Sequence, residues 1–325
     1  MPIFSVLQAT FRPQTTRNYP SSQVALPRTF SRLRRTTGPR LPNRRISVRR
    51  STHRLNAPNP VLTLTRNIRF SLTRTLDRAA VLNTPRGNTH AGWPSMDTLA
   101  GSAWEATIEV RGLPDPRTGY LVGIDQLDLA VRTRSIPRLL EAHAAGECSA
   151  VSVARTILET AGSGLTVKIH AVEVEVEPKT RWRVESGDMS MVLIQRRYEF
   201  SASHRLHLPE LDDAANEALF GKCSNPNGHG HNYEVEVRIE TRDSETPLSI
   251  LAVDDAVNSL LIDRFDHKHL NLDVDDFKER VPSVENIASR CVELLREPIS
   301  ALGSDSRLHA VKVWETPRTA CTVLA

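Results

Sequence analysis

The chain has 325 residues, of which 39% are hydrophobic, and its mean hydropathy is −0.33. This length can hold two domains of ordinary size, and the composition is typical of a soluble protein. No apolar run approaches the roughly 20 residues that a membrane span needs, so we expect neither a transmembrane helix nor a membrane partner. The four cysteines show no CxxC spacing, which favours a reducing compartment, such as the cytoplasm, over a disulfide framework.

The net charge of +4 is unevenly distributed along the chain. The first 74 residues contain fifteen arginines and no acidic residue, whereas the rest contains 27 Lys and Arg against 38 Asp and Glu. The body of the chain is therefore acidic, and the basic pI does not indicate that the folded body binds nucleic acid.

Residues 1–60 mix Arg, Pro, Ser and Thr without hydrophobic periodicity, so we expect a disordered leader. Three explanations for it are open. It resembles an organellar transit peptide, it could be a basic arm that contacts nucleic acid or anionic lipid, or translation was assigned from a start codon too far upstream. The many prolines favour the last explanation, because they would interrupt the amphipathic helix of a transit peptide.

A periodic pattern begins near Val61 and recurs in the second half of the chain. In chain order the sequence predicts a strand at 104–112, a helix at 151–161 and a strand at 170–178, and then strands at 198–204 and 231–239, a helix at 283–296 and a strand at 309–317. HAVEVEVEP (170–178) and HAVKVWETP (309–317) are identical at five positions, which indicates an internal repeat.

Each half reads as strand, strand, helix, helix, strand, strand. This order predicts an α+β fold, in which each unit has a four-stranded antiparallel sheet with two helices on one face. WRVESGD interrupts the apolar pattern, so we expect the boundary at 181–189 and two units, 61–185 and 189–325.

The segment GKCSNPNGHGHNYEVEV, residues 221–237, carries the candidate chemistry. His229 and His231 fall on one face of a strand, and His204 ends another predicted strand, so three imidazoles could converge. Three neutral nitrogen ligands with a vacant fourth position are typical of catalytic zinc. Cys223 lies in the preceding loop, where a nearby dication would favour its thiolate.

The first half lacks these ligands. In the ungapped register of the repeat, Arg74 stands for His204, Ser102 for His229 and Trp104 for His231. Val176 stands for Glu315. Glu175 and Glu177 flank Val176, and a slip of one residue in the register would turn their side chains to the opposite face of the strand. We therefore expect one zinc site per chain.

Five motifs in the second half resemble the 6-pyruvoyl-tetrahydropterin synthases and their relatives, the 6-carboxytetrahydropterin synthases. They are SASHRL, FGKCSNPNGHGHNY, FDHKHLN, VPSVENIA and VWETP, in the family's order. The resemblance covers 195–323 strongly and 66–178 weakly. It implies tandem T-fold units whose sheets close into a barrel on oligomerisation, so three tandem chains would supply the six units of the family's usual hexamer.

The resemblance also implies a lyase reaction on 7,8-dihydroneopterin triphosphate, with loss of triphosphate and internal redox rearrangement of the side chain. His204, His229 and His231 match the family's Zn²⁺ ligands, and Cys223 matches its catalytic base. The resemblance implies that Asp266 and His267 form a proton relay with that cysteine and that Glu315 anchors the pterin. It also implies that Glu285 and Ser283, at the start of a helix, assist in substrate binding. His269 lies near His267, and the sequence alone does not choose between them.

Two alternatives are open. A 6-carboxy-5,6,7,8-tetrahydropterin synthase of the queuosine (7-deazaguanine) pathway takes the same substrate and releases acetaldehyde. Five residues separate Cys223 from His229, as in the pyruvoyl synthases, whereas the carboxy synthases typically have three. The other alternative is a non-catalytic pterin- or metal-binding scaffold, which the presence of Cys223, His267 and Glu315 disfavours.

Overall fold

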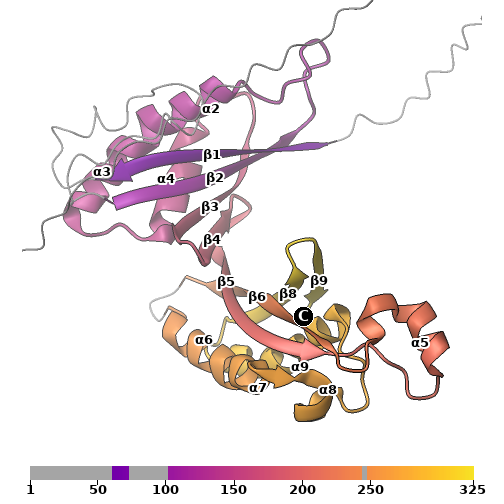
Figure 1. Cartoon of the computed structure of the whole chain (residues 1–325). Coiled ribbons are helices and arrows are strands. Elements are labelled where there is room, and N and C mark those ends of the chain that lie inside the picture. The colour runs from indigo at the N-terminus through magenta and orange to yellow at the C-terminus, as the bar shows by residue number, and fades with distance from the viewer. Residues whose placement is uncertain (1–60, 73–101, 244–246) are drawn as a thin grey trace, which may run out of the picture. The chain divides into compact units, whose positions relative to one another are not determined.

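The computed structural model describes residues 61–72, 102–243 and 247–325 (Figure 1). The predicted leader, residues 1–60, and Arg74 lie outside the described residues, so the three explanations for the leader stay open.

The first half of the described chain has two strands, a run of helices and two further strands. In chain order these are β1 (Leu62–Leu72), β2 (Ser102–Gly112), α2 (Ile124–Ala130), the π-helical turn η2 (Val131–Ser135), α3 (Ile136–Ala145), α4 (Ala150–Ala161), β3 (Ile169–Glu177) and β4 (Thr180–Glu185).

The second half follows the same order with short additions. Its elements are β5 (Asp188–His204), α5 (Asp213–Phe220), η3 (Gly221–Ser224), β6 (His229–Arg242), α6 (Ile250–Val257), η4 (Asn258–Ile262), α7 (Asp263–Phe265), β7 (Lys268–His269), α8 (Leu270–Asp273), η5 (Asp275–Phe277), α9 (Val284–Ala301), β8 (Arg307–Thr316) and β9 (Thr319–Leu324). The predicted α+β order is confirmed, whereas the sequence did not indicate α5 or β7.

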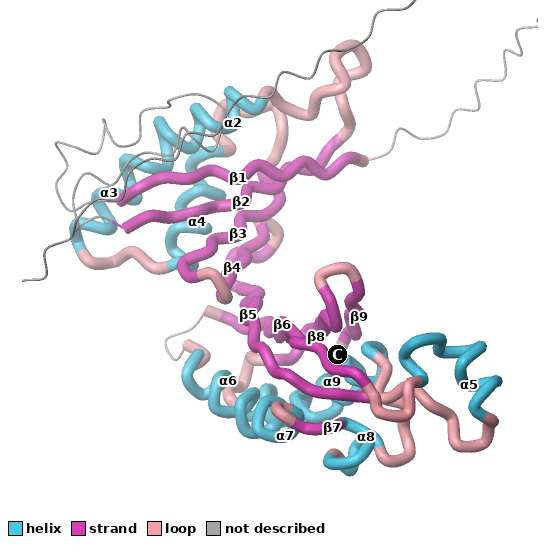
Figure 2. Tube along the Cα trace, in the orientation of Figure 1, coloured by secondary structure: helices cyan, strands magenta, loops and turns pink. Residues whose placement is uncertain are grey.

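The strands form one sheet in the order β1-β2-β3-β4-β5-β6-β8-β9, and neighbours along this path are antiparallel. The two-residue strand β7 pairs in parallel with β5, beside Ala202 and Ser203. Figure 2 shows that in each half the helices lie on one face of that half's strands. Each half thus supplies four strands and one helical layer, as expected.

The two halves share irregularities as well as order. The pairing of β2 with β3 skips His170, and the pairing of β6 with β8 skips His309, the matching residue of the repeat. The next hairpins skip Val176 and Glu315, which also match. A bulge re-aims the side chain it carries. The ungapped register is therefore correct for 170–178 against 309–317, and Glu175 faces Arg181 at 2.9 Å rather than taking the place of Glu315. For the earlier strand the ungapped register is wrong by two residues: Phe70 pairs with Trp104 as Phe200 pairs with Tyr233, so Trp104 corresponds to Tyr233 and Ser102 to His231.

The predicted boundary at 181–189 falls on β4 and on its turn into β5. β4 runs through Glu185 and forms a hairpin with β5, so the sheet continues from one half to the other. The arginines that seemed to interrupt the apolar pattern lie on the face away from the helices. There Arg183 contacts Glu109 at 3.0 Å, while Val184 points into the core. The division into two domains itself stays a prediction.

The core lies between each half's strands and its helices, as two clusters of buried apolar residues. In the second half the predicted helix at 283–296 is confirmed as α9, which buries an apolar stripe of helical period that includes Ile287, Ala288, Cys291 and Leu295. This packing fixes the start of α9 against the strands. As shown below, the start of α9 also contacts the candidate site.

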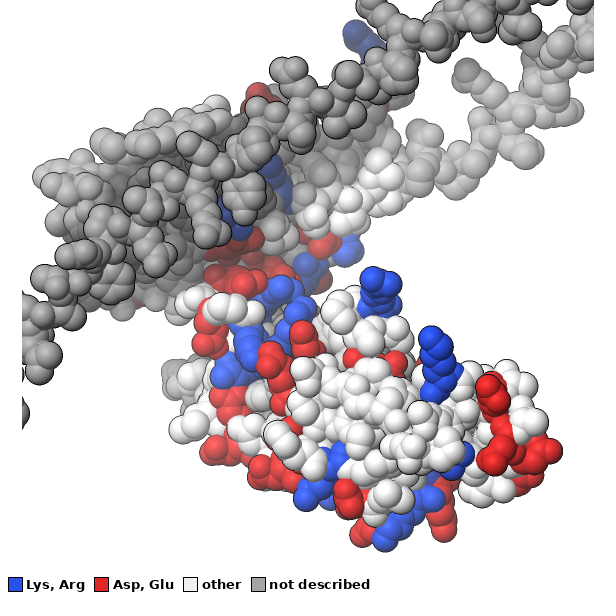
Figure 3. Space-filling view, viewed as in Figure 1, with Lys and Arg blue, Asp and Glu red and all other residues white. Residues whose placement is uncertain are grey.

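Charges on the sheet face away from the helices are paired. Besides the Arg183 pair, Arg197 contacts the buried Glu236 at 3.1 Å, and its guanidinium lies 4.6 Å from the centre of the Trp314 ring. Figure 3 shows basic and acidic side chains interleaved on the surface in view. Among the described residues, no helix is both long enough and apolar enough to cross a membrane.

Candidate active site

Three imidazoles meet where β5 ends and β6 begins. The antiparallel register places His204 opposite His229 and Ala202 opposite His231, so the three rings share one face of the sheet. Their ring centres are 4.5 to 5.2 Å apart, and one ligand atom of each lies within 4.8 Å of the others. The predicted convergence of His204, His229 and His231 is thus seen in the structure.

The His204 ring is held by groups behind it. Its Nδ1 lies 2.7 Å from the carbonyl oxygen of Pro282, just before α9, and Tyr233 Oη lies 3.4 Å from the same nitrogen. A carbonyl only accepts, so Nδ1 carries the hydrogen and Nε2 keeps a lone pair. That lone pair lies 3.1 Å from His229 Nε2. A metal-binding histidine is commonly oriented by this kind of contact.

Burial favours the neutral imidazoles that a metal requires. It lowers the pKa of the fully buried His204 to about 4, with the neighbouring histidines adding to the effect, and it also lowers the pKa of His229. Neutral rings offer lone pairs at physiological pH without competition from protons.

The three residues fit a metal ion. His229 Nδ1 and His231 Nε2 are buried, and neither has a hydrogen-bond partner within the described part of the chain. Buried polar atoms normally have a partner, so lone pairs left in this way beside a third imidazole point to a cation. Three nitrogen donors within 4.8 Å suit a tetrahedral ion with one further position. We call these three residues the histidine cradle.

Glu315 lies at the rim of the histidine cradle. Its Oε1 is 3.4 Å from His204 Nε2 and 3.7 Å from His231 Nε2, and its side chain is 18% exposed. The bulge at the end of β8 turns this side chain toward the cradle. A carboxylate there can contact the metal position and a ligand entering from solvent.

Cys223 lies close to the cradle, in the turn η3 that precedes β6. Its thiol is free and partly buried, and its carbonyl oxygen accepts from Leu206 N at 2.9 Å, which ties the turn to the chain just after β5. Burial raises the pKa of Tyr233, and the negative charge of Glu315 raises it further.

The loop from Cys223 to His229 makes a close approach at Gly228. This residue has a φ of 68°, and a Cβ built there would lie 2.9 Å from both the His204 carbonyl oxygen and His269 Nε2. Glycine avoids both the strain and the clash. The loop can therefore pass directly over the end of β5 and deliver His229 to the cradle.

Asp266 and His267 form a pair of their own. His267 Nδ1 lies 2.7 Å from Asp266 Oδ2, while Asp266 Oδ1 accepts from Ser201 N at 2.8 Å. The hydrogen bond from Ser201 and the contact with His267 lower the pKa of the Asp266 carboxyl. His267 adopts a φ of 56°, and its side chain is 83% exposed. No hydrogen bond among the described residues joins this pair to Cys223 or to the cradle.

Ser283 and Glu285 lie at the start of α9. The Ser283 hydroxyl caps the helix by accepting from Asn286 N at 3.4 Å, and Glu285 is exposed in the first turn. The contact from this segment to the cradle is made by the Pro282 carbonyl instead. Capping explains Ser283, and a place in the first turn of a helix explains Glu285. Their expected part in substrate binding stays a prediction.

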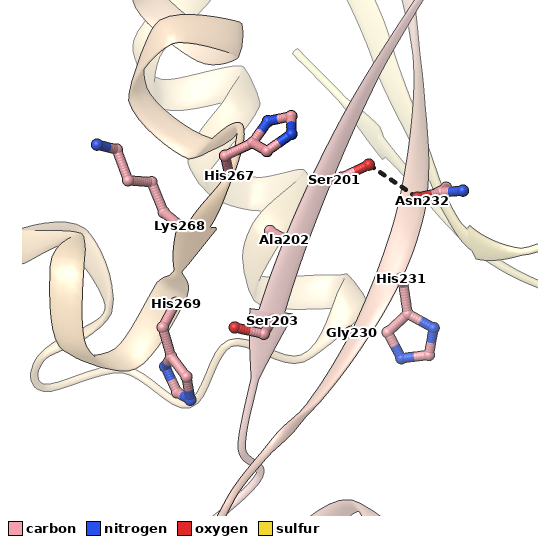
Figure 4. Close-up of a pocket in the computed structure, with 9 residues that line it drawn as sticks. All are labelled: Ser201, Ala202, Ser203, Gly230, His231, Asn232, His267, Lys268 and His269. Carbon is pink, nitrogen blue, oxygen red and sulfur yellow. Dashed lines mark hydrogen bonds between the residues drawn. The ribbon is translucent and has the colours of Figure 1, made fainter.

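A cavity of about 460 Å³ opens beside the cradle and brings in residues that the sequence did not single out (Figure 4). It is lined by Ser201, Ala202, Ser203, Gly230, His231, Asn232, His267, Lys268 and His269. Ser201 Oγ and Asn232 Oδ1 are 2.7 Å apart across the two strands. Position along the strand could have indicated them, because Ser201 and Ser203 alternate with the buried Ala202.

An α+β sheet with its helices on one face and a histidine cradle at two strand ends defines the class: a T-fold protein with a candidate metal centre. The family model for 6-pyruvoyl tetrahydropterin synthase matches residues 193–325. The 6-pyruvoyl tetrahydrobiopterin synthases of Drosophila melanogaster and Homo sapiens are 38% and 37% identical over 131 and 133 residues, and the matches cover 76% and 89% of their lengths and 39% and 40% of this chain.

Among solved structures, 6-pyruvoyl tetrahydropterin synthase of Caenorhabditis elegans is 35% identical, with a TM-score of 0.38; the match covers 42% of this chain and 96% of that one. The sequence matches show that the chain belongs to the 6-pyruvoyl tetrahydropterin synthase family, whose members are lyases. The family assignment from the five motifs is therefore confirmed.

Proposed function

We propose that the chain converts 7,8-dihydroneopterin triphosphate, with loss of triphosphate, into 6-pyruvoyl tetrahydropterin, using Zn²⁺ held by His204, His229 and His231. The observation that carries the proposal is the histidine cradle with Glu315 on its rim. When bound, the ion supplies Lewis acidity toward the side-chain hydroxyls of the substrate. The identity of the curated relatives and the spacing of Cys223 from His229 both favour the pyruvoyl product over the carboxy product.

Glu315 is proposed to anchor the pterin. A carboxylate accepts two parallel hydrogen bonds from a ring N–H and the adjacent exocyclic amine, and such charge-assisted pairs are strong when partly buried. Glu315 is 18% exposed and directly beside His204 and His231, so a ring that it holds would present its side chain to the metal position. Glu285 and Ser283 would border the same ring from the start of α9.

Cys223 is proposed to be the general base. As a thiolate, Cys223 would take up a proton from the C–H adjacent to a side-chain hydroxyl, a proton whose acidity a cation held by His204, His229 and His231 would increase. Asp266 and His267 would then relay the proton. The 2.7 Å contact leaves His267 Nε2 free to exchange a proton while the carboxylate stabilises the imidazolium. The rearrangement is internal, so it needs no external oxidant.

The proposed setting is a cytoplasmic homo-oligomer of tandem chains, most simply a trimer, in which residues 189–325 catalyse and residues 61–185 form the degenerate unit. The exposed position of His267 is consistent with an assembled site, because 83% of its side chain is available to a neighbouring surface. The pterin triphosphate is the proposed small-molecule partner. We propose neither a nucleic-acid nor a membrane partner for the folded body.

Mass spectrometry of the products tests the reaction. The full chain, loaded with Zn²⁺, is incubated with 7,8-dihydroneopterin triphosphate, and Cys223→Ala is treated in parallel. We expect 6-pyruvoyl tetrahydropterin and triphosphate from the parent chain and no turnover from the variant. A carboxylated pterin with acetaldehyde would replace the proposal with the carboxy synthase reaction. Metal and pterin binding without turnover would favour the scaffold.

A further inference from the structure

A second cavity, of about 550 Å³, lies next to the candidate active site. Basic and imidazole side chains contribute to its lining from three segments: 205–207, 269 and 278–280. The cationic or imidazole residues are Arg205, His207, His269, Lys278 and Arg280. Two acidic residues, Glu210 and Glu279, also line it. Such a wall, with several hydrogen-bond donors of fixed or potential positive charge, suits an anion with several oxygen atoms.

His269 joins this cavity to the candidate active site, because it lines both cavities. Its Nε2 lies against the Gly228 turn, and its Nδ1 is buried without a hydrogen-bond partner among the described residues. A buried ring nitrogen without a protein partner is unusual, so this atom is available to a ligand group that enters the cavity. Figure 4 shows the His269 side chain leaving β7 at the opposite end from His267.

Arg205 is built into the wall of the second cavity. It directly follows His204, so its side chain starts next to the histidine cradle. Asn271 clasps its backbone twice, through Arg205 N to Asn271 Oδ1 at 2.8 Å and Asn271 Nδ2 to Arg205 O at 3.0 Å. Arg205 Nε donates to Ser224 O at 2.8 Å. The guanidinium, which lines the second cavity, is thereby held in place.

The ion pairs of these cations do not prevent them from binding an anion. Arg205 Nη2 is 3.9 Å from Asp213, whose side chain is 94% exposed, and Lys278 pairs with an 83% exposed Asp275. Arg280 contacts Glu293 at 3.2 Å, with both side chains about 40% exposed. Exposed pairs of this kind are screened by water and hold their partners only weakly. An anion with a charge of several units can displace them.

We propose that the second cavity is the subsite for the triphosphate of the substrate, with Arg205, His269 and Arg280 as the principal contacts. This inference rests on the proposed function, which places a triphosphate at the end of the side chain that meets the metal position. With the pterin at Glu315 and its side chain at the histidine cradle, the phosphates extend past His204 along Arg205. The leaving group would then be held away from Cys223, and its release would free the cavity.

Calorimetric titration with sodium tripolyphosphate tests the subsite without turnover. The full chain is compared with Arg205→Gln and Arg280→Gln, and with Arg296→Gln as a matched control. Arg296 is exposed on α9 and does not line the cavity, so its loss changes the net charge equally. The titration is repeated on metal-free protein, because tripolyphosphate chelates divalent cations. Arg205→Gln also removes the hydrogen bond to Ser224 O and could disturb the fold. Among the residues that the structure describes, Arg280 makes no such bond, so Arg280→Gln tests the subsite without that effect.

Loss of one charge-assisted hydrogen bond lowers affinity roughly tenfold or more. We expect that decrease for Arg205→Gln and Arg280→Gln, a change of less than about twofold for Arg296→Gln, and unchanged binding of 7,8-dihydroneopterin, which has no phosphate. In turnover KM should rise by the same factor with kcat retained. Equal affinity for all four proteins, or an equal loss in Arg296→Gln, would overturn the subsite. Neither result would bear on the proposed synthase reaction, which the mass spectrometry of its products tests separately.

Discussion

The carbonyl oxygen of Pro282 accepts a hydrogen bond from His204 Nδ1 across 2.7 Å, so the start of α9 sets the ring orientation of a candidate metal ligand 78 residues earlier in the chain. This contact leaves His204 Nε2 to face His229 Nε2 at 3.1 Å. The packing of α9 and the geometry of the histidine cradle are therefore linked. Substitutions in the cradle should change both the metal content and the free energy of unfolding.

Replacing His229 with alanine should remove metal binding. With two imidazoles left, the cradle has too few donors for a stable tetrahedral site, so we expect metal content to fall from one ion per chain to about a tenth of that or less. His143→Ala is the control, because His143 lies in α3 of the first half. Elemental analysis after dialysis measures both. Full metal content in His229→Ala would exclude the cradle as the site.

Acid should destabilise the metal-free protein. The His204 pKa is about 4 in the fold, below the value of 6.5 in the unfolded chain, so between these values the unfolded state binds more protons. The contribution of the neutral ring is complete above pH 6.5 and is lost progressively as pH falls toward 4. From pH 7 to pH 5 the loss is about 2 kcal/mol.

Chemical denaturation of the metal-free protein at several pH values measures this loss. The comparison is with His204→Gln, in which other groups still titrate but this ring is absent. We expect a smaller decrease between pH 7 and pH 5 in the variant. The same pH dependence in both proteins would show that His204 is not held neutral by burial.

Glu315→Gln separates an anchor from a metal ligand. Because Glu315 is proposed to hold the pterin, the variant should keep its metal and bind 7,8-dihydroneopterin roughly a hundredfold less tightly, through the loss of charge-assisted hydrogen bonds. Metal content by elemental analysis and pterin affinity by fluorescence are measured on the same sample. If the metal is lost and pterin affinity kept, Glu315 acts as a metal ligand instead.

Three glycine substitutions test the close approach over β5. Gly228→Ala would combine a φ of 68° with contacts of 2.9 Å, Gly221→Ala has a φ of 55° with open space around it, and Gly187→Ala has neither problem. Gly221 combines a φ of 55° with a ψ of −130°, a conformation essentially confined to glycine, and a side chain held in such a conformation costs about 1 to 3 kcal/mol. We therefore expect the free energy of unfolding to fall most for Gly228→Ala, by about that amount for Gly221→Ala, and little for Gly187→Ala.

Metal content distinguishes the first two variants further. Gly228→Ala should also lose metal affinity, since its Cβ would push the loop and His229 away from His204. Gly221→Ala should keep it. Equal metal affinity in all three proteins would mean that the loop does not position His229.

Much of the fold was predictable from the internal repeat, because period-two strands and the apolar stripe of α9 are local signals. The cradle was predictable for the same reason: alternate residues on a strand share a face, as His229 and His231 do. The bounds of β4 were not predictable from the local pattern, because Arg181 and Arg183 read as polar, whereas the strand pairs them with acids on the outer face.

Other parts of the site had no local signal. The Pro282 carbonyl is a backbone group, and its contact with His204 depends on how α9 docks on the strands. The direction of Glu315 depends on a bulge, which the sequence left ambiguous by one residue. The hydrogen bond from Ser201 N to Asp266 is likewise a tertiary contact, which the order of the motifs does not predict.

The most direct test of the central claim is a titration of metal-free full chain with Zn²⁺, followed by triphosphate release from 7,8-dihydroneopterin triphosphate. The cradle occurs in the second half, and Ser102, which holds the position of His231 in the first half, accepts a hydrogen bond from Trp104 Nε1 at 2.7 Å. We expect activity to rise linearly and to level off at one Zn²⁺ per chain. Full activity without metal, or saturation at two ions per chain, would contradict the claim.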